Sequence, residues 1–243
     1  TVLIQAGNNG AQQTTYRILY EDGREVSRTV FKVDTLVEAQ PEILMIGVQT
    51  PFSPANIPGR LAYLTGGNAW VMEETTGNRR PLVTTGDLDG RIFRLSGDGT
   101  WLLFSRKAAP DSTDINTLWA IRLDQEDPRP VNLKISNAIH FADWMPGSNS
   151  TILYSTVEPR SAAPGWQANN DLRLVTIGAG GTVLRTEEIL DAASGGIYGW
   201  WGTTYRWSPD GQALAYARPD SIGIVDLKEK TQQPLIDVIP FQT

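Results

Sequence analysis

The sequence predicts an all-β protein, and three observations lead to this fold class. The turn Ser208-Pro-Asp-Gly211 is followed at once by the apolar run Ala213–Ala217, in which small and large side chains alternate. Proline presets the backbone at the second turn position, and the closing glycine accepts angles that other residues resist. Variants of this turn recur upstream, and no segment shows a convincing helical period. We expect Ala213–Ala217 to be a strand buried on both faces.

Residues 1–50 are predicted to form a small β unit of their own. The segment Thr14–Tyr20 alternates between polar and apolar residues, as a half-buried strand does. Asp22-Gly23 is a pair favoured in two-residue hairpin turns, and Glu25–Val33 returns from it as a second strand. A further apolar run, Glu42–Gly47, adds a short strand. Such a unit has little room for a core.

This unit resembles the second half of a G5 domain, a small extracellular β module of bacterial surface proteins. The resemblance implies an association with glycans. A generic β-hairpin appendage is the alternative interpretation. The residues that carry the resemblance are Gly7-x-x-Gly10, Tyr16, Gly23-x-x-Val-Ser-Arg28 and Pro41-Glu-Ile-Leu-Met-Ile-Gly47.

Residues 51–59 are predicted to be a linker, because their prolines cannot donate to a strand ladder and favour an extended chain. From residue 60 to residue 243 the chain repeats. Each of the four units opens with an apolar strand, at Leu61–Leu64, Trp101–Phe104, Ile152–Tyr154 and Leu214–Tyr216. A second strand follows in each unit and has Asn or Asp near its start, at Asn68, Asn116, Asp171 and Asp220.

The turn motif precedes the second, third and fourth opening strands and begins at Leu95, Trp144 and Trp207. The spacing is about 50 and then about 60 residues, close to the length of a propeller blade with loop insertions. The pattern predicts a β-propeller of which about four blades are visible, as part of a larger ring. We interpret Arg185–Ala193 as a connection between blades, and Asp210 as a turn-forming residue.

The motif Trp207-Ser-Pro-Asp-Gly211, followed by Ala213-Leu-Ala-Tyr216, resembles the repeat of TolB-type β-propellers, which are also described as WD40-like or PD40 repeats. Similar repeats occur in propellers of prolyl-oligopeptidase relatives and of bacterial surface proteins. The resemblance covers residues 60–243 and departs from the family pattern at Met145 and Gly147.

Composition excludes several classes of function. The net charge is −6 and no basic cluster occurs, which argues against nucleic acid as a partner. The sequence contains no cysteine, so disulfides and thiolate metal sites are excluded. No apolar run reaches the ~20 residues that span a bilayer, so we expect no direct membrane insertion. No phosphate loop or dinucleotide fingerprint occurs, and we expect no cofactor.

No catalytic or metal-binding residue is predicted. A Ser-His-Asp triad would require His140, the single histidine, and no Gly-x-Ser-x-Gly elbow supplies the serine. We expect His140 to be a structural or surface residue in the connection that enters the third unit. Asp87-Leu-Asp-Gly90 is better read as a turn than as a calcium loop. The chain is therefore expected not to be an enzyme.

One aromatic cluster is a candidate binding site. Glycines flank Tyr198, Trp200 and Trp201, and Trp166 lies in a long loop between two strands. Flat side chains on a close backbone can stack on a sugar or on a partner side chain. The alternative interpretation is that these rings fill the gaps between blades.

Two functions remain open. The first is a non-catalytic binding or structural module of a bacterial cell-surface or secreted protein, with a protein or a cell-wall glycan as partner. The alternative is a propeller that gates substrate for a hydrolase or peptidase domain outside this chain. Because the first residue is Thr1, we expect a piece of a longer protein, anchored by a segment that is missing here.

Overall fold

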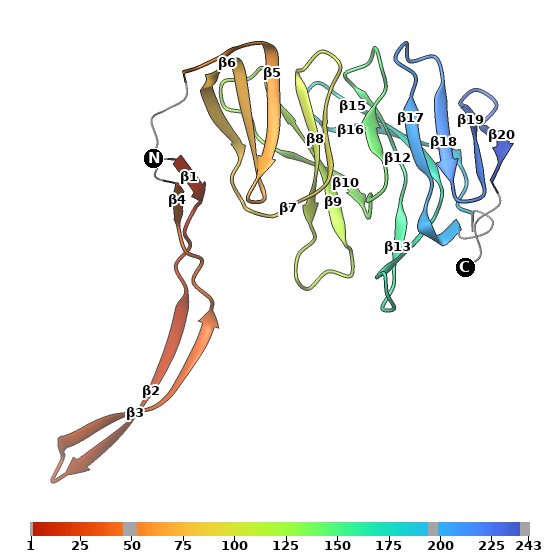
Figure 1. Ribbon diagram of the computed structural model, residues 1–243. Coiled ribbons are helices and arrows are strands. Elements are labelled where there is room, and N and C mark those ends of the chain that lie inside the picture. Colours follow the sequence, from red (N-terminus) through yellow and green to blue (C-terminus); the bar gives the residue numbers. More distant parts are fainter. Residues whose placement is uncertain (1, 46–52, 194–198, 239–243) are drawn as a thin grey trace.

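The computed structural model describes residues 2–45, 53–193 and 199–238, and they form an all-β protein (Figure 1). Within these ranges there is no α-helix, and the helical structure is one short 3-10 helix, η1 (Gly199–Trp201). The predicted fold class is confirmed.

The N-terminal unit consists of two antiparallel pairs, β1 (Val2–Gln5) with β4 (Ile43–Met45) and β2 (Ala11–Glu21) with β3 (Arg24–Val37). Asp22 and Gly23 have φ angles of 49° and 75°, as a two-residue hairpin turn requires. Figure 1 shows the β2–β3 ribbon extending away from the remaining strands. Its residues are almost all exposed, so this unit has little core, as expected.

Three four-stranded antiparallel sheets and one two-stranded sheet follow along the chain. A short hairpin of residues 157–168 is inserted between the second and third strands of one of the four-stranded sheets. We call the four sheets blades 1 to 4. Blade 1 is β5 (Asn56–Thr65) and β6 (Asn68–Val83); blade 2 is β7 (Leu88–Leu95), β8 (Trp101–Lys107), β9 (Asn116–Arg122) and β10 (Val131–Ser136). Blade 3 is β11 (Ala142–Trp144), β12 (Thr151–Tyr154), β15 (Leu172–Ile177) and β16 (Val183–Leu190), with β13 (Val157–Pro159) and β14 (Trp166–Ala168) inserted; blade 4 is β17 (Thr204–Trp207), β18 (Leu214–Arg218), β19 (Ser221–Asp226) and β20 (Thr231–Asp237).

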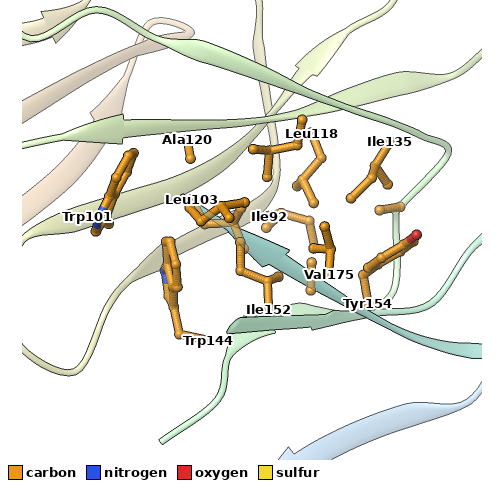
Figure 2. Packing of buried hydrophobic residues seen from close by; sticks show 14 residues of the cluster. Ile92, Trp101, Leu103, Leu118, Ala120, Ile135, Trp144, Ile152, Tyr154 and Val175 are labelled. Atoms are coloured by element: carbon orange, nitrogen blue, oxygen red, sulfur yellow. The ribbon is translucent and has the colours of Figure 1, made fainter. Parts of the chain in front are cut away.

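The core lies between adjacent blades. Each of the three main hydrophobic clusters joins side chains from two neighbouring sheets. Figure 2 shows the central one, where Trp101 and Leu103 of blade 2 face Trp144 and Ile152 of blade 3. Strand β8 is buried on both faces, and this face-to-face stacking of antiparallel sheets is that of a β-propeller. About four blades are present, as predicted, and the larger ring stays a prediction.

The recurrent turn has the same hydrogen bonds in blades 2 and 4. The Ser208 hydroxyl donates to Asp210 and accepts from the backbone N–H of Ala213. Ser96 does the same with Asp98 and Trp101. The Ser208 hydroxyl, and then the backbone N–H of Gln212, lower the pKa of Asp210. Asp210 is thus a turn-forming residue, as predicted.

Each turn joins the first and second strands of its blade, so blades 2, 3 and 4 each have one strand more than the sequence predicted. The first strands β7, β11 and β17 each lie at one edge of their sheet. The sequence predicts that each repeat opens on the strand after the turn, whereas in the structure the sheet begins one strand earlier. Strand β11 has only three residues and is too short to show a period.

Three other predictions are wrong in detail. Residues 56–59 belong to β5, so the linker is shorter than residues 51–59. Residues 183–190 form the outermost strand of blade 3, so most of Arg185–Ala193 is strand rather than connection. Strand β18 is buried on one face only, because Ala215 and Ala217 are exposed on the outer face of blade 4.

The Asn near the start of the second repeat strand ties blade 1 to blade 2 and blade 2 to blade 3. Asn116 Nδ2 donates to Ala138 O on the chain that enters blade 3, at 3.0 Å. Asn68 makes the equivalent link with its side-chain oxygen: Oδ1 accepts from the backbone N–H of Gly86, on the chain that enters blade 2. In blade 3 the link to the next blade is made by Asn170, the residue before the predicted Asp171, and its side chain donates to Gly199 O at 2.8 Å. These buried amides fix where each first strand begins.

Candidate functional site

The first strands of blades 2, 3 and 4 converge on one pocket of about 90 Å³. Liquid water occupies about 30 Å³ per molecule, so the pocket has room for one small polar group. We call it the axial pocket, because each lining strand is the first strand of its blade. Its lining residues come from β7, from β17 and from β11 with the two residues before it: Arg91, Ile92, Arg94, His140, Phe141, Ala142, Asp143, Thr204, Tyr205 and Arg206.

Positive charge exceeds negative charge in the axial pocket. Arg91, Arg94 and Arg206 are all exposed, whereas Asp143 is the single carboxylate among the lining residues. Arg94 Nε lies 3.8 Å from Asp143 Oδ2, which is a loose ion pair. An arginine guanidinium is planar and presents several donors, so it can bind a carboxylate or sulfate with two hydrogen bonds at once.

Asp143 is only 28% exposed, and its burial raises the pKa of its carboxyl group. The backbone N–H of Trp144 and the charges of Arg94 and Arg206 act in the opposite direction but do not cancel this effect. A partly buried carboxylate whose desolvation outweighs its attraction to nearby cations is a cost to the folded state.

The Asp143→Asn variant is therefore expected to be more stable than the parent protein at pH 7. The folded state binds the Asp143 proton more tightly than the unfolded chain, so stability falls as pH rises through the raised pKa. The stability gain of the variant should shrink as the pH approaches about 4, near the ordinary aspartate pKa. Thermal melts across this pH range measure it. Asp127→Asn, in a side chain 82% exposed, is the control. A gain that is independent of pH would contradict this assignment.

His140 closes one end of the axial pocket. Its Nε2 atom is buried and has no hydrogen-bond partner among the described residues. Burial, and then the charge of Arg91, lower the pKa of His140, which is therefore neutral at pH 7. The edge of the imidazole ring meets Trp166, with ring centroids 4.5 Å apart. A Cβ atom at Gly202 would lie 2.7 Å from the same ring, so glycine is required there.

Three of the four predicted aromatic residues lie near this end of the pocket. Trp166 begins β14, which lies beside η1, and η1 holds Trp200 and Trp201. The two indoles stack on each other with centroids 4.2 Å apart, and they are 39% and 52% exposed. Tyr198 lies outside the described residues. Trp166 is partly buried against a small interior cluster, as the alternative interpretation expects, whereas Trp200 and Trp201 are exposed. The binding role of these residues stays a prediction.

The sequence reading missed the charged residues of the axial pocket. A signal for them was present, because the residue one place before each turn motif is charged in blades 2, 3 and 4. These residues are Arg94, Asp143 and Arg206. Aligning the repeats on their turns would have placed the three side chains at equivalent positions of neighbouring blades.

Comparison with known proteins identifies the N-terminal unit. Residues 1–49 match the G5 domain family, which confirms the predicted resemblance for this part of the chain. No curated protein sequence matches the chain.

The solved structures that are similar to this chain include the following three. An uncomplexed acylaminoacyl peptidase of Pyrococcus horikoshii has 16% identity and a TM-score of 0.43, over 71% of this chain and 28% of that one. A periplasmic gluconolactonase of Pseudomonas aeruginosa has 13% identity and a TM-score of 0.46, over 77% of this chain and 56% of that one. Dipeptidyl peptidase 4 of Porphyromonas gingivalis has 13% identity and a TM-score of 0.42, over 92% of this chain and 38% of that one.

The comparisons correct one prediction. The chain was expected not to be an enzyme, but the three similar structures are all of enzymes, so that expectation is withdrawn. The chain spans between 28% and 56% of the length of these structures. A specific relation to TolB-type repeats stays a prediction.

Proposed function

We propose that this chain is the substrate-docking part of a larger bacterial surface protein. Its propeller binds an acidic group of a protein or glycan substrate in the axial pocket and presents the substrate to a catalytic domain outside residues 1–243. The observation that carries this proposal is the convergence of Arg94, Asp143 and Arg206 from three blades on one pocket. The adjacent Arg91 adds a third guanidinium.

The arrangement suits docking because the arginines sit on strands and not on loops. Side chains on rigid strands hold a bound group in a defined orientation. The charges of Arg94 and Arg206 both act on Asp143, and an incoming anion has to compete with this carboxylate for the two guanidinium groups. Long-range attraction by the same charges would increase the rate of encounter with an acidic substrate.

The N-terminal unit fits a location outside the cell. G5 domains are typical of bacterial extracellular proteins, and residues 1–49 match that family. In the part of the chain that the structure describes, no helix is long and apolar enough to cross a membrane. In this proposal the extended β2–β3 ribbon acts as a spacer or wall-associated element beside the propeller.

Kinetics of the full-length protein test the docking role. The substrates are peptide, ester, lactone and glycoside compounds, each prepared with and without a free carboxylate. The Arg94→Gln/Arg206→Gln variant is expected to raise KM for the acidic compounds by at least about tenfold, because a charge-assisted hydrogen bond contributes about 1.5–3 kcal/mol. The kcat values for the neutral compounds should stay unchanged.

Arg129→Gln is the matched control, because the Arg129 side chain is 84% exposed and lies outside the pocket. Equal losses for acidic and neutral compounds would contradict docking through the axial pocket. A full-length protein that turns over none of the compounds would contradict the accessory role and leave a binding scaffold as the second candidate, which the exposed Trp200–Trp201 stack favours.

A further inference from the structure

The axial pocket and the backbone that follows the tryptophan pair meet at His140. The imidazole lines the pocket on one side and contacts the Trp166 ring on the other. Gly202, the residue after Trp201, packs so closely against the imidazole that no Cβ atom would fit between them. An elongated ligand that places one group in the pocket therefore has the aromatic surface within reach.

The tryptophan pair has the properties of a stacking platform. Two indoles stack on each other just before the first strand of blade 4, and with 39% and 52% of their surface exposed they leave part of this apolar stack open to solvent. Asn170 holds the backbone of Gly199 through a buried hydrogen bond, so the short helix that carries the indoles is anchored. Large apolar side chains that are exposed together and held in place commonly mark a binding surface.

We propose that these two features form one site for an acidic glycan, with the carboxylate of a uronic acid unit in the axial pocket and a neighbouring sugar ring on Trp200 and Trp201. This inference rests on the docking function proposed above and names its substrate class. A small pocket suits one carboxylate on a rigid ring, and a flat indole pair suits the apolar face of a sugar. A peptide of glutamate residues would use the arginines but carries no ring that could stack on the indoles.

Calorimetry with trigalacturonate tests the site in the full-length protein. We expect trigalacturonate to bind, its methyl ester to bind at least about tenfold more weakly, and maltotriose not to bind. Arg94→Gln/Arg206→Gln and Trp200→Ala/Trp201→Ala should each weaken trigalacturonate binding by at least about tenfold, which is the loss of one charged hydrogen bond or one stacked ring.

Two controls separate these effects from general damage. Leu184→Ala removes an apolar side chain that is 68% exposed on β16, and it should leave the affinity unchanged. The methyl ester tests the carboxylate on the parent protein, so the conclusion holds even where a tryptophan variant fails to fold.

Three results would overturn the glycan assignment: no binding of trigalacturonate, equal binding of its methyl ester, or tighter binding of a glutamate-rich peptide of the same charge. If one of these occurs while the arginine variant still raises KM for acidic substrates, docking stands and the substrate is not a glycan. If the arginine variant changes neither KM for the acidic substrates nor the affinity for trigalacturonate, both proposals fail.

Discussion

The Phe104→Ala variant is expected to lose about 3–5 kcal/mol of unfolding free energy, the usual range for truncating a fully buried aromatic side chain. Phe104 lies on β8 with none of its surface exposed, in the cluster that joins blades 1 and 2. The neighbouring blades cannot collapse into the resulting cavity without breaking their own ladders. Chemical denaturation monitored by tryptophan fluorescence measures the loss.

Phe31→Ala provides the matched control for this variant. Phe31 lies on the β2–β3 ribbon and is 62% exposed. Its truncation should change the free energy by no more than about 0.5 kcal/mol, as is usual at an exposed site. Similar losses for the two variants would show that the core does not lie between the blades.

The Gly202→Ala variant is expected to lose roughly 2–6 kcal/mol of unfolding free energy, because overpacking and a strained backbone each cost about 1–3 kcal/mol. Gly202 has a φ of +99°, and an added Cβ would lie 2.7 Å from Cδ2 and Nε2 of His140. The variant should therefore also displace His140 from the end of the axial pocket.

A double-mutant cycle with His140→Ala separates the two costs. Removing the imidazole makes room for the new methyl group, so the double variant should recover the overpacking part and keep the backbone part. Gly97→Ala is the control, because no atom lies within 4 Å of its added Cβ and its φ is not positive. Strictly additive losses at Gly202 and His140 would contradict the close contact between them.

Local signals in the sequence predicted much of the fold. The turn Ser208–Gly211 and the Asp22-Gly23 hairpin depend on neighbouring backbone, and the structure places both in the expected role. The recurrent Asn or Asp near a strand start was visible in the sequence, but the bond of Asn116 to the next blade was not predicted. Strand β16 was misread because its charged residues face solvent at the outer edge of blade 3, where no burial pattern marks a strand.

The candidate site was harder to predict because it depends on long-range packing. Arg94, Asp143 and Arg206 are separated by many residues along the chain and meet only when three blades stack. By contrast, Trp200 and Trp201 are adjacent in sequence, and their glycine-rich setting marked them directly. The role of His140 as the link between the two features depends on its contacts with Trp166 and Gly202, which no local pattern encodes.

In the proposed function the axial pocket binds an anion through the arginine side chains of blades 2 and 4. Nuclear magnetic resonance of the arginine Nε–Hε groups, during titration of the full-length protein with sodium sulfate, tests it most directly. The claim predicts that the signals of Arg91, Arg94 and Arg206 shift together and saturate, while that of Arg129 does not. Equal, unsaturated shifts of all four arginines would contradict it.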